Sequence, residues 1–101
     1  MTKPQEFHNE GQVIRKLVCK EGFTLALTKH ARQEMKNDEL DIVDVVQVLK
    51  GCCVIEADGI GDDCKYTAQG KTADSRLVNI VLKLMEDEDK ALVITVFEIM
   101  L

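Results

Sequence analysis

His30 is the residue of this sequence whose type and position best suit catalysis. It lies in the first turn of a predicted helix over residues 29–37, where the positive end of the helix dipole disfavours a charged imidazole. A neutral imidazole can accept a proton near neutral pH, so His30 is a candidate general base. A histidine at a helix start also often packs or caps without a catalytic role, and the spacing alone favours that structural alternative.

A group of cations with one phenol follows in the second half of the chain, and these side chains suit phosphodiester chemistry. Cations neutralise the charge that develops on the phosphate, and a tyrosine or histidine can move a proton. Between residues 65 and 83 the only acidic residue is Asp74, so a local basic patch is a candidate feature. Lysines are common on exposed strands, so the group is weak evidence by itself. Its members are Lys65, Tyr66, Lys71, Arg76 and Lys83.

The charge of the whole chain limits its partners. The net charge is −5, and residues 51–101 hold ten acidic side chains against five basic ones. Extended nucleic-acid binding depends on phosphate neutralisation by lysine and arginine. The acidity therefore disfavours RNA as a partner, although it leaves room for a small local site.

No cofactor and no metal site are predicted. Gly70-Lys71-Thr72 resembles the end of a phosphate-binding loop, but that motif needs a glycine where Lys65 stands and a helix after it. The acidic run 86–89 lacks the spacing of a calcium loop.

With no export signal, no membrane-spanning apolar run and no CxxC spacing, we expect a cytoplasmic protein with reduced thiols. The four cysteines are Cys19, Cys52, Cys53 and Cys64.

Local patterns predict a flexible tail over residues 1–8 and a single domain over 9–101. Side chains that can cap a helix, and glycines that can end one, divide the first half into three helices. The expected N-caps are Asn9, Thr28 and Asp41, and the expected end points are Gly22 and Gly51. Alternating apolar residues also predict a short strand over 23–27.

After residue 51 the hydrophobic period changes to two, which predicts strands. They are expected over 52–57, 65–69, 76–85 and 91–100. Short connections favour antiparallel neighbours, so the predicted fold class is α+β: N-terminal helices packed on a C-terminal antiparallel four-stranded meander, with 23–27 as an optional additional strand. The sheet face away from the helices could meet a partner.

Several short motifs follow one another in a fixed order along the chain. They are Thr28, His30-Ala31 and Met35, then Leu49-Lys50-Gly51, then Arg76-Leu77-Val78, and finally Ile94 and Phe97 with Thr95 between them. In order and spacing, residues 23–99 resemble a bacterial domain-of-unknown-function family. Its pattern is Ser/Thr, then His-Ala-x-x-Arg-Met, a helix ending in Leu-x-Gly, and a meander closing on Ile-x-Thr-x-Tyr.

That family looks like the RelE/ParE-type toxin scaffold, in which helices pack on a small antiparallel sheet. Members of the scaffold cleave RNA without a metal, or bind and block a protein target. The resemblance implies His30, Arg76 and Thr95 as candidate catalytic residues, to which we add Lys71 as a cation. It also implies a small antitoxin-like protein as partner.

Two positions depart from the family pattern. Glu34 stands where the family has arginine, and Phe97 replaces the terminal tyrosine and its hydroxyl. Three hypotheses therefore remain open for function. They are a metal-independent ribonuclease or translation-targeting toxin, a non-catalytic protein-binding module, and a homo-oligomer formed through the final strand or an apolar sheet surface.

Overall fold

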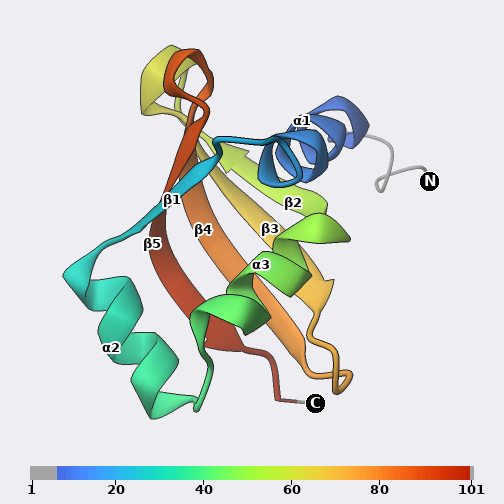
Figure 1. Ribbon diagram of the computed structural model, residues 1–101, viewed down its shortest axis with the longest axis vertical. Coiled ribbons are helices and arrows are strands. Elements are labelled where there is room, and N and C mark those ends of the chain that lie inside the picture. The colour runs from blue at the N-terminus through green and yellow to red at the C-terminus, as the bar shows by residue number, and fades with distance from the viewer. Residues whose placement is uncertain (1–6, 101) are drawn as a thin grey trace.

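Five strands form one mixed sheet in the order β1-β5-β4-β3-β2 (Figure 1). The computed structural model describes residues 7–100. The helices are α1 (His8–Val18), α2 (Lys29–Asn37) and α3 (Ile42–Lys50). The strands are β1 (Thr24–Leu27), β2 (Cys53–Asp58), β3 (Lys65–Lys71), β4 (Leu77–Met85) and β5 (Lys90–Glu98), and the two short 3-10 turns are η2 (Gly61–Asp63) and η3 (Glu86–Glu88).

The α+β class is as predicted, but the sheet has five strands and is mixed. Strands β2 to β5 each pair antiparallel with the next, because short loops connect them. Strand β1 joins as a fifth strand and pairs parallel with β5, with Leu25 opposite Ala91 and Leu27 opposite Val93. In the sequence, two helices and three strands separate the segment at 23–27 from β5. No hairpin loop therefore fixes the direction of this segment relative to β5. A purely antiparallel four-stranded sheet was therefore too simple an expectation.

The helix caps follow the sequence signals in two cases of three. The Thr28 hydroxyl accepts from the Ala31 N–H, and Asp41 forms a reciprocal capping box with Asp44. The expected cap at Asn9 is wrong: α1 already begins at His8, with Phe7 in the N-cap position and no side-chain cap. Phe7 packs against the core, which extends the ordered chain into the predicted tail. The rest of that tail, residues 1–6, lies outside the described residues.

A register shift in β5 changes which of its side chains face the core. Strict alternation would place Val93 and Val96 on opposite faces of the strand. Both are fully buried, because the pairing of β4 with β5 slips by one residue at Ile94. Such a bulge exchanges the two faces of a strand from that point onward. Thr95 consequently lies opposite Val81, on the face away from the core.

The described helices cover one face of the sheet. The closest helix–strand pairs are α1 with β2, α3 with β3 and α2 with β5. Figure 1 shows α1 and α3 in front of the sheet and α2 beside the outer edge of β5. On this face the side chains of β4, such as Ile80, are fully buried, whereas Leu25 and Leu27 of β1 are only partly buried. Within residues 7–100, no helix has the length and apolar character needed to cross a membrane.

The cysteines are all unpaired thiols in two environments. Cys52 and Cys64 are buried, whereas Cys19 and Cys53 are exposed. Burial raises the pKa of the Cys52 thiol to about 11, and Arg15, whose guanidinium donates to the Cys52 carbonyl at 2.6 Å, opposes that rise. The native state therefore favours the neutral thiol at this position.

Stability should fall as the pH rises from about 9 to about 11. Below pH 9 the Cys52 thiol is protonated in both the native and the unfolded state. Between pH 9 and 11 this thiol ionises in the unfolded state but not in the native state, which favours unfolding. Above pH 11 it ionises in both states, and the loss of stability stops growing. The loss is of the order of 2 kcal/mol and is measurable by urea unfolding under reducing conditions. Cys52→Val should flatten this dependence, and Cys53→Val, at the exposed neighbour, should not. Equal slopes for the two variants would contradict this account.

Candidate functional site

The start of α2 is tied to β5 through Thr28. Its hydroxyl accepts from the Ala31 N–H at 3.0 Å and donates to the Ile94 carbonyl at 3.1 Å. His30 follows in the first turn, as predicted, and its side chain is 66% exposed. Its Nε2 lies 3.4 Å from Glu34 Oε1, one turn further along the helix. A solvent-facing imidazole beside a carboxylate is therefore present at this end of α2.

The two carboxylates that follow on α2 accept hydrogen bonds from the backbone of β5. Glu34 Oε1 accepts from the Val96 N–H, and Asp38 Oδ2 accepts from the Glu98 N–H, both at 3.0 Å. Strand β1 pairs with β5 only as far as Val93, so these N–H groups lie on an edge that no strand covers. An unpaired backbone group at a buried position is costly. Glu34 and Asp38 thus close the remainder of the edge from the side of the helix.

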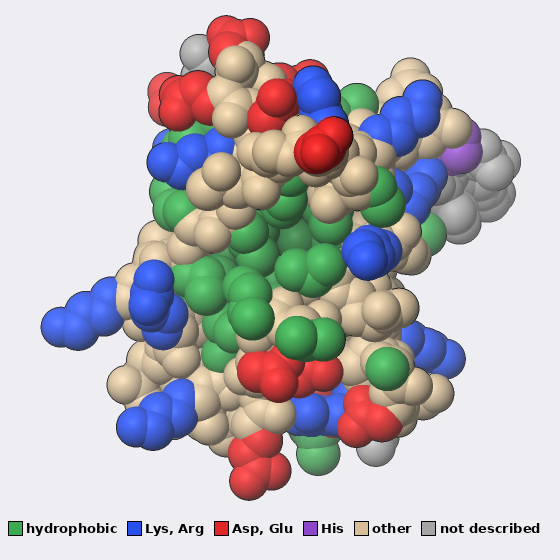
Figure 2. Space-filling view, viewed as in Figure 1, with side chains coloured by type: hydrophobic (Ala, Val, Ile, Leu, Met, Phe, Trp, Pro, Cys, Tyr) green, Lys and Arg blue, Asp and Glu red, His purple; other side chains and the backbone are tan. Residues whose placement is uncertain are grey.

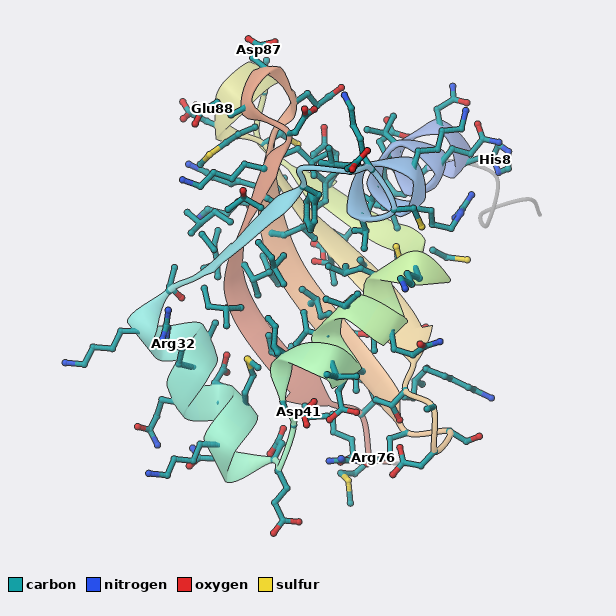
Figure 3. All side chains as sticks on the ribbon, in the orientation of Figure 1. His8, Arg32, Asp41, Arg76, Asp87 and Glu88 are labelled. Atoms are coloured by element: carbon teal, nitrogen blue, oxygen red, sulfur yellow. The ribbon has the colours of Figure 1, made fainter. Side chains whose placement is uncertain are left out.

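Arg76 fastens the other end of α2. Its Nη2 lies 2.8 Å from Glu98 Oε1, and its Nε is 3.2 Å from the same oxygen. The same guanidinium donates to the carbonyls of Glu39 and Asp38, where α2 ends. The hydrogen bond to Glu98 raises the pKa of Arg76, so the guanidinium stays positively charged. Figure 3 shows Arg76 near Asp41, at the end of the molecule opposite Asp87 and Glu88.

The four predicted catalytic residues make their contacts in different places. His30 and Arg76 contact opposite ends of α2, about 12 Å apart along the helix axis. Lys71 is exposed at the end of β3, opposite Leu77, and belongs to the strand instead of the predicted loop. Thr95 faces the side of the sheet without helices. No described hydrogen bond or ion pair joins any two of the four, and their catalytic role stays a prediction.

A cavity of about 510 Å³ lies at the other end of the sheet, between η2 and η3. Tyr66 and Lys83 from the predicted basic group line it, together with the acidic residues of η3. Burial and then the hydrogen bond with Cys64 raise the pKa of Tyr66 to about 12, so its phenol stays protonated. Three carboxylates against one lysine make the lining net negative, which disfavours a phosphate. Among residues 7–100, no group of three or more His, Cys, Asp or Glu is placed to hold a metal ion.

A hydrophobic surface lies in the middle of the helix-bearing face, where Figure 2 shows it as a hollow between the helices. Leu25 and Leu27 share this face because they lie opposite the buried Ala91 and Val93. They are only partly buried, as is Val46 of α3. Ile42, one turn before Val46, is 43% exposed. We call Leu25, Leu27, Ile42 and Val46 the central apolar patch.

These features define a small α+β protein with a mixed five-stranded sheet, one helix-bearing face and an edge closed by helix side chains. The family model described as "Domain of unknown function (DUF4258)" matches residues 27–98, and the chain belongs to this family. The matched segment runs from the last residue of β1 to the end of β5, so it includes α2, α3 and the four antiparallel strands. Searches of curated proteins and of solved structures found no match.

Sequence patterns located the ends of α2 but missed the function of its polar face. The sequence shows Glu34 as a departure from the family arginine, and it assigns Asp38 no contact. Their spacing of four does place them on one helix face. That spacing could indicate a shared contact, but not that the contact is the backbone of β5.

Glu34→Ala should lower the free energy of unfolding by about 1–2 kcal/mol, because the buried Val96 N–H loses its acceptor. Glu34→Gln should cost clearly less, since the amide oxygen can still accept. His30→Ala is the matched control on the same helix and should change little, as its side chain is mostly exposed. Urea unfolding of the three variants measures the difference, and equal losses for Ala and Gln would show that the hydrogen bond is unimportant.

Proposed function

We propose that this protein is a non-catalytic protein-binding module that recognises its partner through the central apolar patch. The observation that carries the proposal is this patch itself, a hydrophobic surface on the helix-bearing face whose side chains are partly buried or, at Ile42, exposed. Contiguous exposed apolar surface on a small protein commonly marks an interaction site. A partner would bury it at the centre of an interface with a polar rim.

The polar contacts beside α2 favour binding over catalysis. Arg76 has its guanidinium bound to Glu98 and to two backbone carbonyls, so it has little capacity left for a phosphate. Glu34 and Asp38 are occupied with the backbone of β5. Side chains held in this way support the structure of the module. The patch, by contrast, makes no polar contact that a partner would have to break.

Ile42→Lys should weaken binding of the partner at least about tenfold, because it places a charge in the patch. The partner is first identified by crosslinking in the cells of origin and mass spectrometry, and its affinity is then measured with both proteins purified. Ile42 begins α3 and is 43% exposed, so the substitution should leave the fold intact.

The control is Ile60→Lys, which makes the same change at a side chain that is 90% exposed in the loop before η2. It should bind like the unaltered protein. A partner that binds the Ile42→Lys variant with unchanged affinity would refute the use of this surface.

A second candidate function is a metal-independent ribonuclease or translation-targeting toxin on a RelE/ParE-type scaffold, with a small antitoxin-like protein as partner. One observation favours it: His30 is solvent-facing and lies beside Glu34, as a general base with an orienting carboxylate would. The order of two helices followed by four strands in the matched segment also supports this scaffold. The net negative lining of the cavity and the guanidinium of Arg76, which is already hydrogen-bonded, are evidence against this function.

If this second function holds, inducing the protein should arrest growth and His30→Ala should abolish the arrest. The variant must remain folded, which circular dichroism and its urea midpoint establish. Arg32→Ala, at an exposed position on the same helix, is the control and should still arrest growth. Growth that continues with the unaltered protein, or arrest that survives His30→Ala, would exclude His30-dependent catalysis.

A further inference from the structure

From the charges around the central apolar patch we infer the chemistry of its partner, an inference that rests on the proposed function. The partner segment is an amphipathic α-helix with an apolar stripe in its middle and lysine or arginine at both ends. Two observations lead to this assignment. The first is the presence of acidic groups beyond both ends of the patch. The second is that few backbone hydrogen-bonding groups remain free along the sheet edge beside it.

The first acidic group lies beyond one end of the patch, the end at which β1 starts. The carbonyl of Asp89 accepts from the Thr24 N–H, which places the η3 turn directly next to β1. Glu86, Asp87 and Glu88 of that turn are exposed. Lysines lie here too: Lys20 pairs with Asp89 at 2.8 Å, and Lys83 lies 3.8 Å from Asp63. None of the ion pairs among the described residues engages the three exposed carboxylates of η3.

The second acidic group lies beyond the other end, where α3 begins. Asp41 and Asp44 cap that helix through each other's backbone N–H groups, so both carboxylates are held beside Ile42. Glu39 is exposed just before them. Arg76 lies within electrostatic reach of Asp44, and its guanidinium is paired with Glu98. Figure 3 shows Asp87 and Glu88 at the top of the view and Asp41 in its lower half, at the start of α3.

This arrangement disfavours a second copy of the chain as the occupant. A twofold axis through the patch would bring an acidic end of one copy against an acidic end of the other, whichever way the axis runs. The net charge of −5 on each copy adds to that repulsion. A partner with cations at both ends meets attraction at both places.

The backbone next to the patch favours a helix over an added strand. Strand β1 is four residues long, and a short edge offers few hydrogen bonds to an incoming strand. Beyond it, Thr28, Glu34 and Asp38 already occupy the edge of β5. A helix satisfies its own backbone and needs only side-chain contacts. The longest dimension of the protein is 35 Å, so a helix of about 18 residues, or about 27 Å, would span most of that length.

The test uses synthetic 18-residue peptides and the full ¹⁵N-labelled chain. One peptide carries a leucine stripe at helical spacing with lysines in its first and last turns. A second has the same stripe with glutamates at the ends, and a third has the lysines with the leucines scrambled. Affinity and the location of binding are measured by NMR titration at low and physiological salt.

We expect the lysine-ended striped peptide to bind about tenfold more tightly than either of the others, with weaker binding at higher salt. The shifted resonances should include Leu25, Leu27, Ile42 and Val46. Ile42→Lys should weaken this binding about tenfold, and Ile60→Lys should leave it unchanged. Equal affinity for the glutamate-ended peptide, or shifts centred on the opposite sheet face at Val81 and Leu92, would overturn the inference.

The two proposals fail in different ways. If the natural partner loses affinity for the Ile42→Lys variant while no lysine-ended peptide binds, the partner chemistry is wrong and the binding surface stands. If the natural partner keeps its affinity for that variant, the proposed function itself fails, whatever the peptides do.

Discussion

The closure of the β5 edge by the side chains of α2 is the contact on which the rest of this structure depends. Strand β1 covers the first half of that edge and then ends, which leaves backbone groups at a partly buried position. Thr28, Glu34 and Asp38 satisfy them, and Arg76 holds the far end of the helix in place. The position of α2 in turn sets one wall of the central apolar patch. An open edge would also be a site of aggregation, so this closure has a protective role as well.

The same contacts change the meaning of the residues that looked catalytic. In the sequence, His30 and Arg76 resemble parts of a site for phosphodiester cleavage. In the structure Arg76 binds Glu98 and carbonyl groups at the far end of α2, and the carboxylates of Glu34 and Asp38 bind N–H groups. Glu34, which departs from the family arginine, has an acceptor role that an arginine could not fill at the Val96 N–H. The departure therefore has a structural explanation without any reference to catalysis.

Charge and apolar surface are separated on this molecule. Acidic side chains, with lysine and arginine among them, lie beyond both ends of the apolar surface on the helix-bearing face (Figure 2). Surface charge steers the approach and selects the partner, whereas apolar burial supplies most of the affinity. An acidic protein with this arrangement suits a partner that is basic at its ends and apolar in its middle, and it suits an extended RNA poorly.

The sequence by itself determined the α+β class, the caps of α2 and α3, and the antiparallel order of the last four strands. These depend on local signals: side chains that bond a backbone one turn away, hydrophobic period, and short loops. Only the tertiary structure decided the parallel pairing of β1, the bulge at Ile94 and the partners of Glu34, Asp38 and Arg76. Each of these joins residues distant in the chain, such as Glu34 with Val96 and Arg76 with Asp38. Local patterns carry no information about such pairs, because a carboxylate on an exposed-looking helix face has the same spacing whether it meets water or a strand edge.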